Sequence, residues 1–301
     1  MISKTFRIVG MIVLASFALS SAAVATCSNA SLSGTYGFLH GSTDSNGAPI
    51  SAAVSQLTFD STTGTFTGET TASHDGVITT FSFTGAYAIA SDCTGTGTPT
   101  GHNVFSFVVT PTGFLAVEPF NPTLGATSEG FAVKQGSPIC TNAGVQGSFG
   151  LETTGVVLAP TTGPVAFIGE LKLTVKPSGE GVISGHVSGS KGASLTLAEE
   201  PVTGSYTVAT DCTGTATIRP RGHSEMHFSL VVVDRGKEML AIETDSDTVV
   251  SGALVKGSND SGVSAATSVC RKQEFAQNAQ SQKFNELIRA FPKDNTSVIR
   301  R

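Results

Sequence analysis

The segment His223-Ser-Glu-Met-His227 is the best candidate in the sequence for a site that does chemistry. On a strand, His223, Glu225 and His227 point to one face, because successive side chains alternate between faces. Two imidazoles and a carboxylate could bind zinc or another transition metal and leave one position open for water. Three polar residues on one strand are also typical of an ordinary solvent-facing surface. The segment therefore predicts either a metal site or an outward strand face.

Other chemical motifs are weaker. Asp44-Ser-Asn-Gly47 and Asp245-Ser-Asp247 are rich in oxygen ligands, but neither continues into a twelve-residue calcium loop, so turn chemistry explains both. The carboxylates of Glu199 and Glu200 stand beside Pro201, and nothing places a partner opposite them. No Gly-x-Ser-x-Gly elbow or phosphate-cradling glycine motif has a strand-to-helix context. We therefore expect no catalytic residues and no cofactor.

The chain contains a tandem repeat. The segment Gly85–Thr96 matches Gly204–Thr215, and both contain Asp-Cys-Thr-Gly-Thr. Further matches occur in the same order, and the offset between them drifts as loop insertions would make it drift. A repeat of this length indicates domain duplication rather than a solenoid. The predicted domains are residues 26–139 and 140–270. The stretch His102-Asn-Val104 aligns with the metal candidate, so that candidate belongs to the second repeat alone.

The five cysteines follow the repeat. Cys27 corresponds to Cys140, and Cys93 corresponds to Cys212. If the same pairing occurs within each repeat, the disulfides are Cys27–Cys93 and Cys140–Cys212, and Cys270 is left over. We favour this pairing. The alternative, Cys93–Cys140 with Cys212–Cys270, leaves Cys27 unpaired and stays open at this point.

Each repeat is predicted to be all-β. Short segments of alternating polar and apolar residues recur about every 8–12 residues and are separated by glycine-rich turns. In Ser55–Asp60, for example, Leu57 and Phe59 share a face. Short connections favour an antiparallel meander of seven or eight strands, and closing the meander into a barrel removes exposed edges. We therefore predict two small antiparallel β-barrels, with a β-sandwich as the alternative.

The N-terminus predicts export. Lys4 and Arg7 precede an apolar stretch from Ile8 to Leu19, and Ala23-Val-Ala25 provides a signal peptidase site, so residues 1–25 form a predicted signal peptide. A retained anchor and a lipoprotein modified at Cys27 are the alternatives. No later apolar run is long enough to span a bilayer, which argues against an integral membrane protein. Export permits disulfides and places the protein in the periplasm or outside the cell.

The C-terminal segment, residues 271–301, differs in composition from the repeats. Phe284, Leu287, Ile288 and Phe291 follow the spacing of one helix face, and Pro292 ends the pattern. This predicts a short, basic amphipathic helix. The rest of the chain is acidic, and Lys134 is the single Lys or Arg between residues 27 and 139. Because a phosphate-binding face needs clustered Lys and Arg, nucleic acid is not an expected partner.

The stretch Cys27–Phe38, together with Asp-Cys-Thr-Gly-Thr at 92–96 and 211–215, resembles a group of uncharacterised exported bacterial β-proteins. The resemblance covers both repeats but not the tail. It implies export, a β-fold and the first of the two disulfide schemes, and it implies no activity. Phe149 in the second repeat departs from the pattern, in which Tyr36 occupies the equivalent position.

These observations favour a secreted, non-enzymatic binding or surface-associated module. A small apolar ligand held in a barrel, or a component of the cell surface, is the expected partner. The alternatives are a metal-dependent enzyme that uses the second repeat and a structural or adhesive extracellular protein. The sequence leaves the oligomeric state undetermined.

Overall fold

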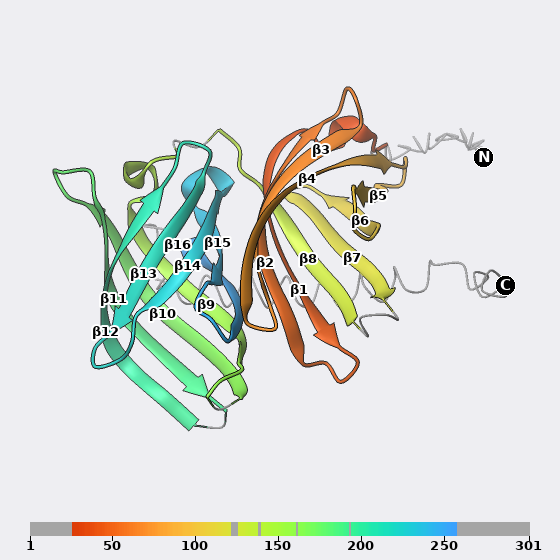
Figure 1. The fold of residues 1–301 in the computed structure, drawn as a ribbon. Helices are drawn as coiled ribbons and strands as arrows, with labels where there is room; N and C mark the ends of the chain where they lie inside the picture. Colours follow the sequence, from red (N-terminus) through yellow and green to blue (C-terminus); the bar gives the residue numbers. More distant parts are fainter. Residues whose placement is uncertain (1–25, 122–125, 138–139, 161, 193, 258–301) are drawn as a thin grey trace, which may run out of the picture.

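The computed structural model forms two closed barrels, each of eight antiparallel strands in sequential order (Figure 1). The structure describes residues 26–121, 126–137, 140–160, 162–192 and 194–257. The predicted signal peptide, Cys270 and the predicted C-terminal helix lie outside the described residues. The prediction of tandem barrels is confirmed. The sandwich alternative is wrong, because the first and last strands of each sheet pair with each other and close it.

Each barrel follows a short 3₁₀ helix. Barrel 1 consists of η1 (Asn29–Ser31), β1 (Gly34–Asp44), β2 (Pro49–Asp60), β3 (Thr65–His74), β4 (Val77–Ile89), β5 (Thr94–Pro99), β6 (Phe105–Thr110), β7 (Gly113–Asn121) and β8 (Ala126–Lys134). Barrel 2 consists of η2 (Asn142–Val145), β9 (Gly147–Val157), β10 (Gly163–Val175), β11 (Gly181–Lys191), β12 (Ser194–Val208), β13 (Thr213–Pro220), β14 (Met226–Val233), η3 (Asp234–Gly236), β15 (Glu238–Glu243) and β16 (Thr248–Lys256).

The alternation along the strands fills the barrel interiors. In β2, Leu57 and Phe59 point inward and are buried, whereas Thr58 between them is exposed. The core of barrel 1 is mostly aromatic. Its buried members are Leu32, Tyr36, Leu57, Phe59, Phe66, Tyr87, Phe105, Phe107, Phe114, Ala116 and Ala132. The core of barrel 2 is mostly aliphatic, and Met226, Phe228, Leu230 and Val232 of one strand face it, as the alternation predicts.

One end of each barrel, which we call the floor, is closed by the 3₁₀ helix. In barrel 1, the Asn29 side chain accepts a hydrogen bond from the Ile89 backbone at 2.9 Å, and the Tyr87 hydroxyl donates to the Leu32 carbonyl at 2.8 Å. In barrel 2, Asn142 accepts from the Val208 backbone at 2.8 Å. The repeats therefore close their floors with the same device.

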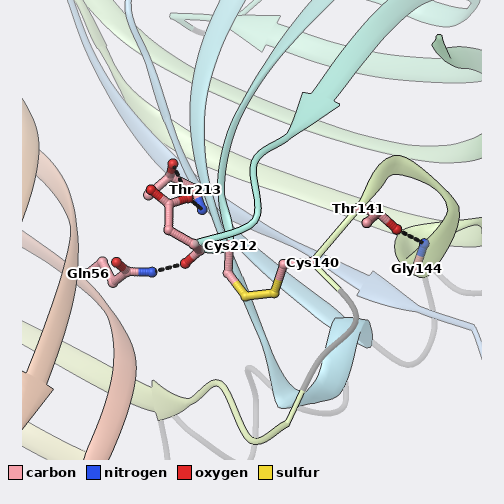
Figure 2. The surroundings of a disulfide bond; sticks show 7 residues. Gln56, Cys140, Thr141, Gly144, Cys212 and Thr213 are labelled. Carbon is pink, nitrogen blue, oxygen red and sulfur yellow. Dashed lines mark hydrogen bonds between the residues drawn. A yellow bond between two sulfur atoms is a disulfide. The ribbon is translucent and has the colours of Figure 1, made fainter. Parts of the chain in front are cut away.

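A disulfide fastens each floor to the sheet. The bonds are Cys27–Cys93 and Cys140–Cys212, the pairing that the repeat favours, and Figure 2 shows the second. Cys93 and Cys212 adopt left-handed backbone angles, with φ of 71° and 74°. The preceding aspartates are exposed and cap the turn, so Asp-Cys-Thr is a turn motif.

The two barrels pack side by side through apolar outer faces. One shared cluster contains the buried residues Leu39, Ala52, Val54, Val231, Val233, Leu240, Ile242, Val249 and Ala253. Gly37 permits this close approach, because a Cβ at this position would lie 2.5 Å from a methyl group of Val233. Ser229 also donates to the Thr71 hydroxyl at 3.3 Å. In the part of the chain that the structure describes, no helix is long and apolar enough to cross a membrane.

Candidate functional site

The predicted metal-binding segment lies at the start of β14. Only His227 is in the strand, and its ring Nδ1 lies 2.7 Å from Oδ1 of Asp245. Its Nε2 lies 3.9 Å from a carboxylate oxygen of Glu225, which also pairs with Arg219. The side chains of Arg219, Glu225, His227 and Asp245 form a row of polar groups on the outer surface.

His223 is not part of this row of side chains. It lies in the turn after β13, where its backbone N–H donates to the Pro220 carbonyl at 3.1 Å. Within the described ranges, no group of three or more His, Cys, Asp or Glu side chains is arranged to hold a metal ion. A metal site of His223, Glu225 and His227 would require this turn to move, and it stays a prediction.

The two oxygen-rich motifs form turns. Oδ1 of Asp44 accepts hydrogen bonds from the backbones of Asn46 and Ala48, both at 2.8 Å, and these bonds lower the pKa of Asp44. The Asp245 carbonyl accepts from the Thr248 hydroxyl at 2.8 Å. Its carboxylate, however, binds His227 rather than its own turn.

The interior of barrel 1 changes character at the end opposite the floor, which we call the far end. The inward-facing Phe38, His40 and Phe83 are half-buried, and Phe81 is 38% exposed. The aromatic core therefore does not continue to this end. Solvent reaches aromatic side chains that the strand alternation directs inward, and this region is the candidate ligand site.

His40 is the distinctive polar group of the far end. Its ring stacks on Phe38, with centroids 4.8 Å apart and planes 15° apart. Burial lowers the pKa of His40 from 6.5 to about 4, so the imidazole is neutral at pH 7. No described residue forms a hydrogen bond with its ring nitrogens. The neighbouring hydroxyls, in contrast, bond to each other: Ser55 to Thr70 at 2.7 Å, for example.

Barrel 2 is filled at the matching positions. The registers align Phe38 with Leu151 and His40 with Thr153, and those barrel 2 residues are 3% and 2% exposed. Ala53, opposite His40, is replaced by Phe167, opposite Thr153. The void among the core side chains is about 10 Å³, roughly the volume needed for one water molecule. This void is too small for an organic ligand.

The far end of barrel 2 nevertheless buries two polar groups. The Thr153 hydroxyl is buried without a hydrogen-bond partner among the described residues. Glu243 is 7% exposed, and burial raises its pKa to about 7. The charge of Asp245 adds to the increase, and His227 opposes it. The sequence analysis assigned no role to Glu243.

Comparisons with known proteins give little further information. No family model matches the chain, and no curated protein matches it. One similar solved structure is the crystal structure of a protein of unknown function from the DUF3598 family of Nostoc punctiforme PCC 73102. It is 9% identical and matches over 76% of this chain and 97% of that chain, with a TM-score of 0.24.

Proposed function

We propose that the protein is an exported, non-enzymatic binding module that holds a small apolar ligand at the far end of barrel 1. The observation that carries the proposal is the contrast in exposure between the barrels. Phe38 and Phe83 remain partly accessible at the far end of barrel 1, whereas Leu151 and Val202, which occupy the matching positions of barrel 2, are 3% and 2% exposed. Exposed apolar surface that faces inward gains free energy when a ligand covers it.

The lining indicates the chemistry of the ligand. Phe38, Phe81 and Phe83 offer aromatic surface, and the described residues at this end include no Lys or Arg that could pair with an anion. His40 supplies a neutral imidazole without a described hydrogen-bond partner. A ligand with an apolar body and one hydroxyl or amide group would match both features, with the polar group hydrogen-bonded to the imidazole.

Export is part of the same proposal. Two disulfides are compatible with an oxidising compartment, where such bonds persist. The signal peptide remains the basis for export and stays a prediction.

Fluorescence titration of the full disulfide-bonded chain with N-phenyl-1-naphthylamine, an uncharged apolar probe, tests the proposal. We expect saturable binding of one probe per chain, accompanied by increased emission. Ala53→Phe introduces into barrel 1 the side chain that Phe167 provides at the matching position of barrel 2. We expect this variant to bind the probe at least tenfold more weakly. Ile168→Phe is the control, because it adds a phenyl ring at a position that is 52% exposed on barrel 2.

Circular dichroism identifies the variants that fold. Absence of saturable probe binding by the wild-type chain would overturn the proposal. Unchanged binding by a folded Ala53→Phe variant would overturn the assignment to barrel 1. If Ala53→Phe does not fold, His40→Trp provides a second obstruction at the same end, with the same expected loss of binding.

A further inference from the structure

A second candidate site lies outside the barrel interior, on the outer face of β2, β3 and β4. This groove has a volume of about 560 Å³, within the range of small-molecule sites, roughly 300–1,000 Å³. Its lining residues are Gln56, Thr58, Thr67, Gly68, Glu69, Ser82, Phe83, Thr84, Thr100 and His102. The alternation places most of their side chains opposite to the inward-facing core residues.

The lining is polar and nearly free of charge. It contains five hydroxyl groups, on Thr58, Thr67, Ser82, Thr84 and Thr100, each of which can donate and accept hydrogen bonds. Glu69 is its only carboxylate, and the lining has no Lys or Arg. Such a surface is matched by a neutral molecule with many hydroxyl groups. A phosphate or carboxylate ligand would meet the negative charge of Glu69 without a balancing cation.

One end of the groove offers an aromatic surface. The ring of His102 stacks on Phe81, with centroids 5.4 Å apart and planes 18° apart, and lies 5.7 Å from the ring of Phe83. The face of an aromatic ring is negatively polarised and attracts the weakly positive C–H groups of an apolar ligand face. Hydroxyl groups along a groove with an aromatic surface at one end suit a sugar ring, which has polar edges and apolar faces.

The other end of the groove is fixed by barrel 2. The side-chain nitrogen of Gln56 donates to the main-chain carbonyl of Asp211, beside the Cys140–Cys212 disulfide (Figure 2). This bond orients the Gln56 amide before any ligand arrives. A preoriented group loses less conformational entropy on binding. The packing of the two barrels therefore orients a lining residue of the groove.

The equivalent face of barrel 2 has different chemistry. By register, Thr58 corresponds to Lys172, Glu69 to His186 and Ser82 to Pro201. These substitutions replace hydroxyl and carboxylate groups with a cation, an imidazole and a proline ring. The neutral, hydroxyl-rich lining is therefore particular to barrel 1 and is not a general consequence of the repeated fold.

We propose that this groove binds a neutral glycan, with Glu69 accepting hydrogen bonds from sugar hydroxyls and His102 packing against a ring face. The proposal is separate from that of a ligand in the barrel interior, because most of the groove lining faces outward. The two sites share Phe83, which lines the groove and also lies at the far end of barrel 1, so variants that change one site alone are needed to distinguish them.

Isothermal titration calorimetry of the full disulfide-bonded chain with maltotriose, cellotriose and N,N′,N″-triacetylchitotriose tests the proposal, with trigalacturonic acid as a charged comparison. We expect saturable binding of at least one neutral trisaccharide and at least tenfold weaker binding of the charged one. Glu69→Gln and His102→Ala should each weaken neutral binding about tenfold, as expected for losing a charge-assisted hydrogen bond or a stacking partner.

Two controls separate this site from its surroundings. His186→Gln changes the equivalent position in barrel 2 and should leave the affinity within twofold. Ala53→Phe should weaken binding of the apolar probe at least tenfold without changing trisaccharide binding, so the two proposals can fail separately. No saturable binding of any of the three neutral trisaccharides, or unchanged affinity in both groove variants, would overturn the glycan site.

Discussion

Barrel 1 and barrel 2 have the same strand order and the same floor, but they differ in the side chains at their far ends and in how deeply these are buried. Both floors use an asparagine on a 3₁₀ helix, a tyrosine hydroxyl and a disulfide. At the far ends, His40 opposite Ala53 in barrel 1 becomes Thr153 opposite Phe167 in barrel 2. The groups that close the floor are therefore alike in the two barrels, whereas the interior side chains at the far end differ.

The difference separates two tasks within one fold. Barrel 2 buries aliphatic side chains on its inside and presents Val231, Val233 and Leu240 on its outside to barrel 1. Burial of apolar surface on both faces stabilises barrel 2 and its contact with barrel 1. Barrel 1 leaves aromatic surface accessible at its far end, and we assign ligand binding to it for this reason.

Removal of the disulfides gives the largest expected effect and tests whether the floors are equivalent. The bonds join residues 66 and 72 positions apart, so the chain-entropy model gives each about 4 kcal/mol of stability. We expect Cys27→Ser with Cys93→Ser to lower the free energy of unfolding about as much as Cys140→Ser with Cys212→Ser. Urea denaturation measures both losses. A loss confined to one pair would show that only one floor depends on its disulfide.

The buried ionisable groups predict opposite pH dependence for the two barrels. The pKa of Glu243 is raised from 4.5 to about 7. Its contribution to the free energy of unfolding is therefore fully present below pH 4.5 and is lost as pH rises through 7. This loss is on the order of 3 kcal/mol. The pKa of His40 is lowered from 6.5 to about 4. Its contribution to the free energy of unfolding is therefore present above pH 6.5 and is lost as pH falls towards 4.

Hydrogen exchange followed by mass spectrometry measures the stability of each barrel separately between pH 4 and pH 8, after correction for the intrinsic exchange rate. Glu243→Gln should flatten the profile of barrel 2 and leave that of barrel 1 unchanged, and His40→Gln should do the reverse. Parallel profiles in both barrels, insensitive to these substitutions, would contradict the assignment.

The sequence predicted the features that depend on local pattern and on the repeat. Alternation along Ser55–Asp60 identified the inward face, and the duplicated Asp-Cys-Thr motif favoured the observed disulfides. It did not identify His40 as an inward residue, because the adjacent Phe38 and Leu39 are both apolar and do not show which face of the strand points inward. The groove was also missed, because it combines Gln56, Glu69 and Ser82 from three strands whose register the sequence does not specify.

Zinc binding gives the smallest expected effect. It tests the candidate metal site of His223, Glu225 and His227, which the sequence predicts for the second repeat alone. His227 presents Nε2 towards Glu225 while Asp245 holds Nδ1, an arrangement in which a carboxylate orients a histidine that could bind a metal. However, Arg219 already pairs with Glu225, and His223 lies in a separate turn. A metal would have to displace that ion pair, so we expect weak binding.

Excess zinc should raise the melting temperature by less than about 2 °C, and His223→Ala should not change the shift. Differential scanning calorimetry with and without EDTA measures this. A larger shift that His223→Ala removes would establish the three-ligand site, and would require the turn to close over the metal.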